Sequence, residues 1–189
     1  MGIFSGIKYF WFVTLRIAKY RLLSDCHRIT GEPNRYHPLL LKGKGRIHFG
    51  DNVQIGVISS PHFYSHYTYL EARERDSEIY IGNHVALNNN FSAVAFSKIT
   101  ISDFTVIGVN CAIIDNDGHH LDPNKRNDST PEMAEVYIEE NVFLGDNVTI
   151  LKGVRIGKNS VIGSGSIVTK SIPENVVAAG NPAKIIRNL

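Results

Sequence analysis

The chain has 189 residues, enough for one domain with a sizeable core, and its 43% hydrophobic and 20% charged residues are ordinary for a globular protein. A formal net charge of +2, with no long basic run, argues against nucleic acid as a partner. The two cysteines, Cys26 and Cys111, lack metal-ligand spacing and form no disulfide framework, so we expect a reducing, cytoplasmic compartment and no metal.

Residues 1–24 predict an amphipathic helix, because apolar side chains recur every three or four residues, at Phe4, Ile7, Trp11, Leu15, Ala18 and Leu22. Basic residues interrupt every apolar stretch before it reaches the roughly 20 residues that a membrane-spanning helix needs. The preferred interpretation is that this apolar face packs on the protein itself. The alternative is peripheral membrane contact, with the aromatic residues inserted and four bases facing lipid phosphates, namely Lys8, Arg16, Lys19 and Arg21.

From residue 46 onward the dominant pattern has a period of six. Aliphatic residues stand six apart without exception at Ile138, Leu144, Ile150, Ile156, Ile162 and Val168. The same phase holds upstream at Ile81, Leu87 and Ala93 and, after a slip of two residues, at Ile101, Ile107 and Ile113. This period fits neither an α-helix nor an alternating open-sheet strand. It is typical of a solenoid in which each hexapeptide makes one short strand and one corner, and three hexapeptides make a triangular coil.

The pattern predicts an all-β solenoid domain over residues 46–189, preceded by a helical or irregular segment over residues 1–45 and ending in a short C-terminal tail. Aliphatic residues should point inward and stack from coil to coil, while parallel ladders between coils satisfy the backbone. Cys111 falls in the small-residue position after Ile107, so we expect it to be a buried hydrophobe.

The repeat is suspended over residues 114–137, where the chain must leave the prism as a loop. The segment is polar and rich in turn-forming residues, and a long loop on a rigid scaffold is a usual place for chemistry. It opens with the sequence DNDGHH, Asp115 to His120. A hydroxyl or amine that attacks as a nucleophile needs a group that takes its proton, and an imidazole beside an orienting carboxylate does this well. Asp115, Asp117 and His119 supply that combination within five residues.

The C-terminal sequence IGKNSVIGSGSIVTKSIPENVVAAGNPAKIIRNL, Ile156 to Leu189, resembles the end of hexapeptide-repeat acyltransferases. Maltose, galactoside and bacterial surface-polysaccharide O-acetyltransferases are the most similar in pattern, and the resemblance covers Ile79 to Leu189. It implies a left-handed parallel β-helix, where the general crossover rule would have predicted a right-handed coil. It also implies acetyl-CoA as co-substrate, and a homotrimer with active sites between neighbouring chains.

The resemblance also suggests roles for individual residues. DNDGHH is similar to the D-x-D-x-H pattern of the polysaccharide enzymes, which makes His119 the general base. His120, where those enzymes commonly have proline, is the alternative base. In the sequence LNNNF, Asn88 and more weakly Asn90 are implied to bind the acceptor, with a structural role at a corner as the alternative. The implied contacts to coenzyme A are Ser164, Thr169, Lys170, Lys184 and Arg187, and the three cations among them suit the phosphates.

The predicted function is O-acetylation of a sugar in lipopolysaccharide or capsule, with N-acetylation of a nucleotide-linked amino sugar as the runner-up. Phe96 stands where the maltose and galactoside enzymes carry an acidic residue, which argues against a simple galactoside or maltose as acceptor. Two other classes remain open. One is a non-catalytic β-helix used for assembly. The other is a gamma-type carbonic anhydrase, for which zinc ligands would have to come from the remaining histidines, among them His48, His62, His66 and His84.

Overall fold

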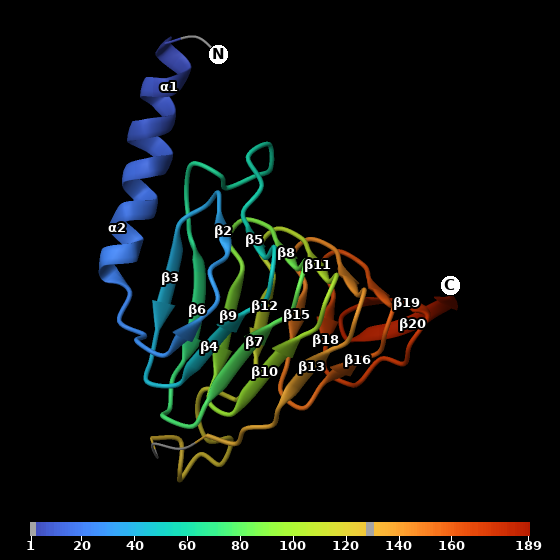
Figure 1. Ribbon diagram of the computed structural model, residues 1–189. Helices are drawn as coiled ribbons and strands as arrows, with labels where there is room; N and C mark the ends of the chain where they lie inside the picture. The colour runs from blue at the N-terminus through green and yellow to red at the C-terminus, as the bar shows by residue number, and fades with distance from the viewer. Residues whose placement is uncertain (1–2, 128–130) are drawn as a thin grey trace.

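The computed structural model describes residues 3–127 and 131–189, with side chains from residue 6 onward (Figure 1). Three parallel sheets wrap into a triangular solenoid, and successive strands of the chain enter successive sheets. The first sheet contains β1 (Ile29–Thr30), β4 (Arg46–Phe49), β7 (Glu78–Ile81), β10 (Lys98–Ile101), β13 (Val136–Ile138) and β16 (Arg155–Ile156). The third sheet contains β3 (Leu39–Lys42), β6 (Thr68–Ala72), β9 (Ser92–Ala95), β12 (Ala112–Ile114), β15 (Thr149–Ile150) and β18 (Ile167–Val168).

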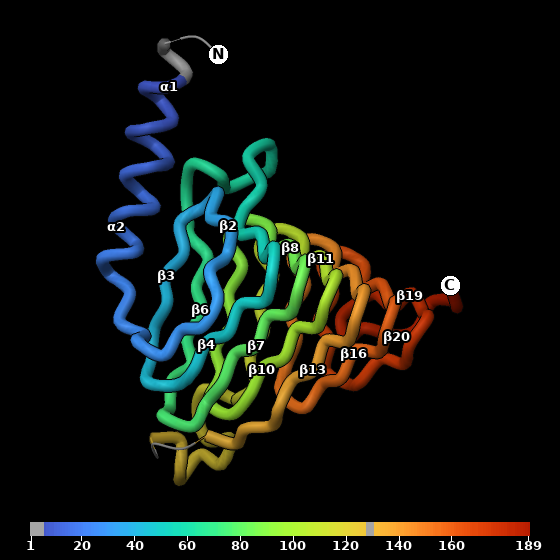
Figure 2. The backbone as a smooth tube through the Cα atoms, in the orientation of Figure 1, coloured from blue at the N-terminus to red at the C-terminus, as the bar shows by residue number. Residues whose placement is uncertain are grey.

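The second sheet is the longest, because the C-terminal tail extends it. Its strands are β2 (Asn34–Arg35), β5 (Gln54–Ile55), β8 (Ala86–Leu87), β11 (Val106–Ile107), β14 (Phe143–Leu144), β17 (Val161–Ile162), β19 (Val176–Gly180) and β20 (Ala183–Asn188). The tail turns back after β19, so β20 pairs with it in the antiparallel direction. In the smooth trace of Figure 2 the coils progress from the N-terminal end to this tail.

The core is a set of aliphatic columns that run through the coils. In the second sheet one inward position is in register from coil to coil, through Ile55, Leu87, Ile107, Leu144, Ile162 and Ala178, and all six are at most 1% exposed. Cys111 is buried among these columns as predicted, and burial raises the pKa of its thiol to about 11. Burial of each such aliphatic side chain contributes roughly 1.5–3 kcal/mol, so the columns supply most of the driving force for folding.

The corners between sheets explain the many asparagines. Seven asparagines have a positive φ, in the left-handed region that asparagine tolerates better than most residues. The amides of six of them also bond along two corners of the prism. One ladder joins Asn90, Asn110 and Asn147, with Nδ2 to Oδ1 distances of 2.7 and 2.8 Å. The second ladder runs through Asn141, Asn159 and Asn175.

The solenoid begins earlier than the sequence pattern predicts. The strands β1, β2 and β3 pair in parallel with β4, β5 and β6, so residues from Ile29 onward form a first coil. The predicted boundary at residues 45/46 therefore falls inside the solenoid. The reason is spacing: β1, β2 and β3 begin at Ile29, Asn34 and Leu39, five residues apart, which a search for a period of six does not detect.

The N-terminal helix is present as predicted. The face that was predicted to pack on the protein is exposed instead. Its segments α1 (Ile3–Tyr9), η1 (Phe10–Thr14, a π-helical turn) and α2 (Leu15–Leu23) follow one another, and Figure 1 shows the rod beside β3 and extending past it. The exposed side chains include those of the predicted face, Ile7, Trp11, Leu15, Ala18 and Leu22. The side chain of Phe4 lies outside the described residues.

The packed side of the helix is held by other groups. Val13 is 1% exposed, and the ring of Tyr20 stacks on Tyr67 with centroids 4.5 Å apart. The Arg16 guanidinium donates to the carbonyl oxygen of Phe63 at 3.0 Å and to that of His66. The correction has a physical reason: an aromatic stack and a cation bound to loop carbonyls anchor the helix, and aliphatic periodicity does not reveal either contact. In the part of the chain that the structure describes, no helix is long and apolar enough to cross a bilayer.

Candidate active site

The interrupted repeat forms a loop that leaves the prism at the corner between the third and first sheets, after β12 and before β13 (Figure 1). The two ends of this loop pair with each other at its base. Asn116 and Met133 form an antiparallel bridge, and the Ala134 N–H donates to the carbonyl oxygen of Asp115 at 2.8 Å. The Asp117 N–H likewise donates to the carbonyl oxygen of Glu132 at 3.1 Å. The loop is therefore a protrusion on a closed base, with 128–130 outside the described residues.

Asp115 attaches the start of the loop to the preceding coil. Its carboxylate is fully buried and accepts the backbone N–H groups of Phe96 at 2.8 Å and Ser97 at 2.7 Å. A buried carboxylate is stable when donors of this kind surround it. Both of its oxygens are thus committed to the backbone of the solenoid, so Asp115 is an anchor of the loop and does not orient an imidazole.

Asp117 is also committed elsewhere. Its carboxylate lies 2.6 Å from the ammonium of Lys152 on the next coil, and Glu132 lies 3.0 Å from the same ammonium. Hydrogen bonds to these two carboxylates raise the pKa of Lys152. Among the residues that the structure describes, neither Asp115 nor Asp117 is hydrogen-bonded to His119, which corrects the orienting role predicted for them.

His119 is instead oriented by the backbone of its own loop. Its Nδ1 lies 3.2 Å from the carbonyl oxygen of Arg126, and the side chain is exposed. Because a carbonyl oxygen can only accept, Nδ1 carries the proton in this contact and Nε2 keeps its lone pair. The exposed Nε2 is thereby free to accept a hydrogen bond or a proton. His120 differs, because it is half-buried and its buried Nδ1 has no hydrogen-bond partner among the described residues.

The two asparagines predicted to bind an acceptor differ in their contacts. Asn90 has φ +60° and belongs to the corner ladder, so the alternative interpretation as a corner residue holds for it. Asn88 is half-exposed after β8 at the corner between the second and third sheets, and its Oδ1 accepts the Asn89 N–H at 2.8 Å. Its Nδ2 group takes part in no hydrogen bond within the described residues, so it can serve a ligand.

A residue that the sequence did not single out shapes the surroundings of Asn88. Asn89 is fully buried, and its amide bonds the backbone of the segment 57–67, which connects β5 to β6 at the same corner one coil earlier. The buried ring of His37 holds the same segment through the carbonyl oxygens of His62 and Ser65, at 3.2 and 3.1 Å. This insertion therefore stands as a fixed wall beside Asn88.

The residues predicted to contact coenzyme A are all exposed at the C-terminal end. Thr169 and Lys170 follow β18 at the corner that also carries the loop, two coils beyond it and therefore about 10 Å along the edge. Lys184 and Arg187 lie on β20 at the end of the second sheet, and Ser164 accepts the Asp146 N–H at 3.1 Å. The ion pairs found among the described residues do not include Lys170, Lys184 or Arg187.

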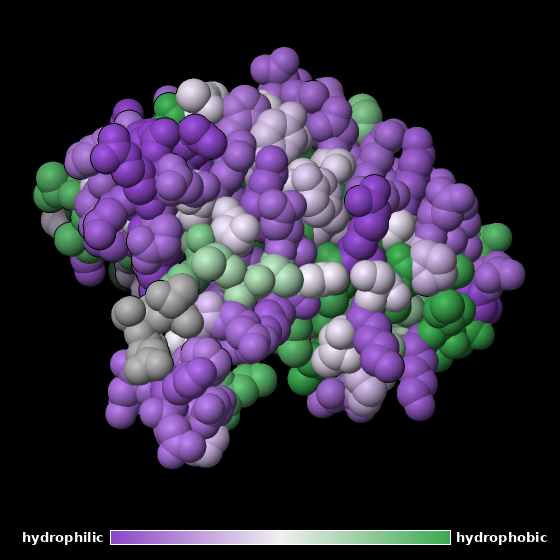
Figure 3. Space-filling view, turned by 90° about the horizontal axis from the view of Figure 1, so that it is seen from below, coloured by the Kyte–Doolittle hydropathy of each residue, from purple (hydrophilic) through white to green (hydrophobic). Residues whose placement is uncertain are grey.

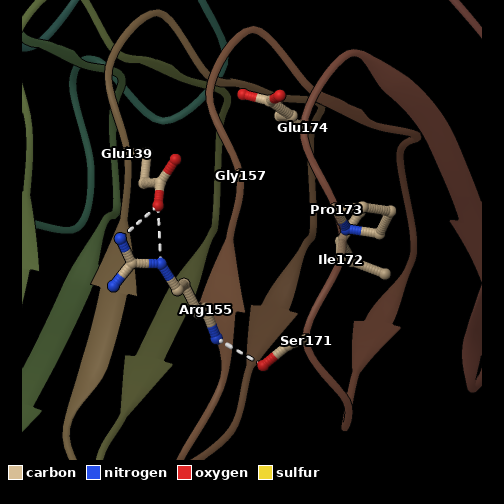
Figure 4. Close-up of a pocket in the computed structure, with 7 residues that line it drawn as sticks. All are labelled: Glu139, Arg155, Gly157, Ser171, Ile172, Pro173 and Glu174. Carbon is tan, nitrogen blue, oxygen red and sulfur yellow. Dashed lines mark hydrogen bonds and ion pairs between the residues drawn. The ribbon is translucent and has the colours of Figure 1, made fainter.

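The predicted residues do not line one closed cavity of a single chain. Thr169 and Lys170 share an edge with the loop, whereas Ser164 follows β17 at the same corner as Asn88, and Lys184 and Arg187 lie on β20. Seen from the loop edge, Figure 3 shows a largely hydrophilic surface around the loop, with hydrophobic side chains exposed toward the C-terminal coils. A surface hollow of about 500 Å³ lies elsewhere, on the first sheet, and Figure 4 shows Arg155 bonded to Glu139 and Ser171 within it. None of the predicted site residues lines that hollow.

Comparison with known proteins is consistent with this architecture. Residues 135–170 match the family described as Bacterial transferase hexapeptide (six repeats). WbbJ of Escherichia coli K12, named as a lipopolysaccharide biosynthesis O-acetyl transferase, is 35% identical over 158 residues, which cover 79% of this chain and 76% of WbbJ. The galactoside O-acetyltransferase of Lactococcus lactis is 43% identical over 59% of this chain and 53% of that protein.

Among solved structures, the hexapeptide-repeat acetyltransferase VCA0836 of Vibrio cholerae, complexed with acetyl-CoA, superposes with a TM-score of 0.63. The two are 28% identical over 75% of this chain and 70% of that one. The chain belongs to the hexapeptide-repeat acetyltransferase family. The predicted left-handed parallel β-helix is thereby confirmed. The chain spans less than two thirds of several curated relatives, including 53% and 55% of two galactoside enzymes.

The histidines of the zinc hypothesis are engaged in separate contacts. His48 stacks on Tyr80 with centroids 4.7 Å apart, and His84 stacks on Phe104 at 5.1 Å. His62 and His66 contact each other in the insertion, away from both stacks. Within residues 6–127 and 131–189, no group of three or more potential metal-ligating side chains converges.

The anchoring role of Asp115 is testable. Asp115→Ala leaves the buried N–H groups of Phe96 and Ser97 unpaired, so we expect a loss of about 2–5 kcal/mol in the free energy of unfolding and faster exchange of those two amides. Asp122→Asn changes an exposed loop carboxylate and is the control, with little effect expected on either quantity. Unchanged exchange at residues 96 and 97 in Asp115→Ala would contradict the assignment.

Proposed function

We propose that this chain is an acetyl-CoA-dependent O-acetyltransferase that acts on a sugar hydroxyl in the biosynthesis of bacterial lipopolysaccharide or capsule. The observation that carries the proposal is the exposed His119, whose Nδ1 donates to the Arg126 carbonyl so that Nε2 keeps its lone pair. This base lies on an anchored loop at the same edge as Thr169 and Lys170. The names of WbbJ and of the galactoside relatives support O-acetyl transfer.

The chemistry of the proposed site balances with one base. Acetyl-CoA supplies an acetyl thioester, and Nε2 of His119 removes the proton of the acceptor hydroxyl as its oxygen bonds to the acetyl carbonyl carbon. The carbon–sulfur bond then breaks, and the imidazolium returns the proton to the departing thiolate. The products are an acetyl ester and the thiol of coenzyme A. The Arg126 carbonyl holds the Nδ1 proton throughout and stabilises the imidazolium that forms between the two transfers.

The surroundings of Phe96 support an acceptor other than a simple galactoside or maltose. The Arg73 guanidinium lies over the ring of Phe96, 4.7 Å from its centroid, and also bonds the Glu71 carboxylate. The Phe96 N–H is already used by Asp115. At this position the chain therefore has an aromatic ring with a cation over it. The maltose and galactoside enzymes that the sequence resembles have an acidic residue there. WbbJ, whose match covers more of this chain than the galactoside enzymes do, points to the same acceptor class.

The outer faces of the prism support a homotrimer. The outward positions of the second sheet form an apolar column, Ala86, Val106, Phe143, Val161 and Val177. The first sheet instead carries ion pairs outward, such as Lys98 with Glu78 and Arg155 with Glu139. Nearly half of the Val106 and Phe143 side chains is exposed in one chain. Neighbouring copies would cover this column, and we expect His119 of one chain to face the coils of another.

The first test uses release of coenzyme A thiol in the presence of candidate acceptors. We expect sugars of surface polysaccharides to be acetylated, and maltose and simple galactosides to be poor acceptors. With the best acceptor, His119→Ala should lower kcat roughly 10²–10⁴-fold while acetyl-CoA still binds, because only the base is lost. His120→Ala is the matched control and should keep most of the activity. An active His119→Ala with an inactive His120→Ala would transfer the role of base to His120.

The second test concerns the donor. Lys170→Ala, Lys184→Ala and Arg187→Ala should each raise the KM for acetyl-CoA roughly five- to a hundredfold and leave the acceptor KM little changed, because each cation is proposed to pair with a phosphate. Lys158→Ala, which removes a cation paired with Glu140 on the first sheet, is the control. Calorimetry that detects no acetyl-CoA binding at millimolar concentration would overturn the enzyme assignment itself.

The third test is the assembly state. Light scattering should give three times the chain mass of 21.1 kDa. Val106→Glu with Phe143→Glu should shift the protein toward the monomer, because two charges would be buried in the subunit contact. Thr100→Glu, on the polar first sheet, should leave the trimer intact. A fully active monomer would refute the proposal that neighbouring chains complete the site.

A further inference from the structure

The N-terminal helix has two sides with different surroundings. One side is fixed to the protein by Val13, by the stack of Tyr20 on Tyr67 and by the Arg16 guanidinium. The opposite side exposes large apolar side chains over successive turns. Trp11 is 61% exposed and Leu22 is 86% exposed, and the same exposed surface includes Ile7, Leu15 and Ala18. We name these five residues the outer helix face.

The outer helix face is too extensive to be an incidental group of surface residues. Phe10 and Phe12 are also about half exposed, so aromatic rings widen it on both sides of Trp11. Monomeric proteins rarely leave an apolar patch of this kind uncovered unless it binds something. Figure 1 shows that the helix lies along the N-terminal end of the solenoid, beside β3, and continues beyond the strands. The face is therefore accessible to a broad, flat surface.

The charge of the helix indicates what that surface is. Residues 1–24 contain four basic residues and no acidic residue, whereas the rest of the chain has 16 basic and 18 acidic residues, since the totals are 20 and 18. The helix therefore carries +4 and the remainder −2. Lys8, Lys19 and Arg21 are exposed and lie next to members of the outer helix face in the sequence. A helix with an exposed apolar face, aromatic residues and bases at its borders fits the interface of a bilayer with anionic headgroups.

We propose that the outer helix face docks this protein on a membrane surface that contains anionic lipid. The helix lies in the plane of the interface, with Trp11 and the aliphatic side chains among the acyl chains and the bases at the phosphates. A second copy of the helix is a poor occupant, because pairing two outer helix faces would bring the three bordering positive charges of one copy against three of the other. The proposal does not depend on the acetyltransferase activity, since it concerns a surface away from His119.

The chain contains one tryptophan, so Trp11 reports directly on the outer helix face. The full chain is titrated with vesicles of phosphatidylcholine alone and with vesicles that also contain phosphatidylglycerol. With the anionic vesicles we expect a blue shift of Trp11 emission, quenching by brominated acyl chains, and co-sedimentation that weakens as salt increases. Emission that stays unchanged with anionic vesicles would overturn the proposal, and equal binding to both vesicles would overturn the anionic assignment.

Two double variants separate the apolar and basic contributions, and both keep Trp11. Ile7→Glu with Leu22→Glu should lower vesicle partitioning at least tenfold, and Lys19→Glu with Arg21→Glu should do the same for the anionic vesicles only. The matched controls are Ile58→Glu, an exposed apolar residue of the insertion, and Lys44→Glu, an exposed base of the solenoid. Both controls should bind like the parent chain.

The mass of each variant in solution distinguishes a lipid surface from a protein neighbour. An unchanged mass for Ile7→Glu with Leu22→Glu, together with lost vesicle binding, supports membrane docking. A smaller mass for this variant would show that the outer helix face is a contact between copies, and would overturn the proposal. Vesicle binding equal to that of the parent chain would overturn it as well.

Discussion

The constraint on which the structure depends is that each coil must present the next one with the same inward side chains in the same register. A parallel ladder repeats at about 4.8 Å, so an aliphatic residue in one coil lies directly over its counterpart in the next. Ile107 over Leu87 and Leu144 over Ile107 are examples. The corners must close within a fixed number of residues, and left-handed asparagines such as Asn110 make this possible. The two long segments that do not fit this spacing, 57–67 and the loop between β12 and β13, are extruded.

Each of the two extrusions is fixed to the solenoid by buried polar groups, and the terminal helix rests on one of them. The loop after β12 is fixed by Asp115, and the insertion at 57–67 is fixed by Asn89 and His37. The N-terminal helix rests on that insertion through Arg16 and Tyr20. The proposed membrane surface and the wall beside Asn88 are therefore parts of one packed unit.

The sequence allowed the periodic part of the fold to be predicted, because a period of six over Ile138 to Val168 has few structural explanations. It did not reveal the first coil, whose strands begin five residues apart from Ile29. It located the loop and His119, but not the partners of the two aspartates. Asp115 bonds the backbone of Phe96 and Asp117 bonds Lys152, and both partners come from neighbouring coils. Proximity along the chain to His119 was a misleading guide, since in a solenoid the nearest neighbours are often about 20 residues away.

The contact between His119 and the Arg126 carbonyl means that a main-chain atom sets the tautomer of the His119 imidazole. A substitution of any side chain in the loop leaves that acceptor in position, provided that the backbone keeps its path. Side chains around the proposed base are therefore free to diverge, and a lineage could exchange one acceptor for another while the proposed proton transfer stays intact. Insertions, deletions and prolines between residues 119 and 126 are different, because they displace the oxygen itself. The base is thus robust to changes of residue type and sensitive to changes of loop length.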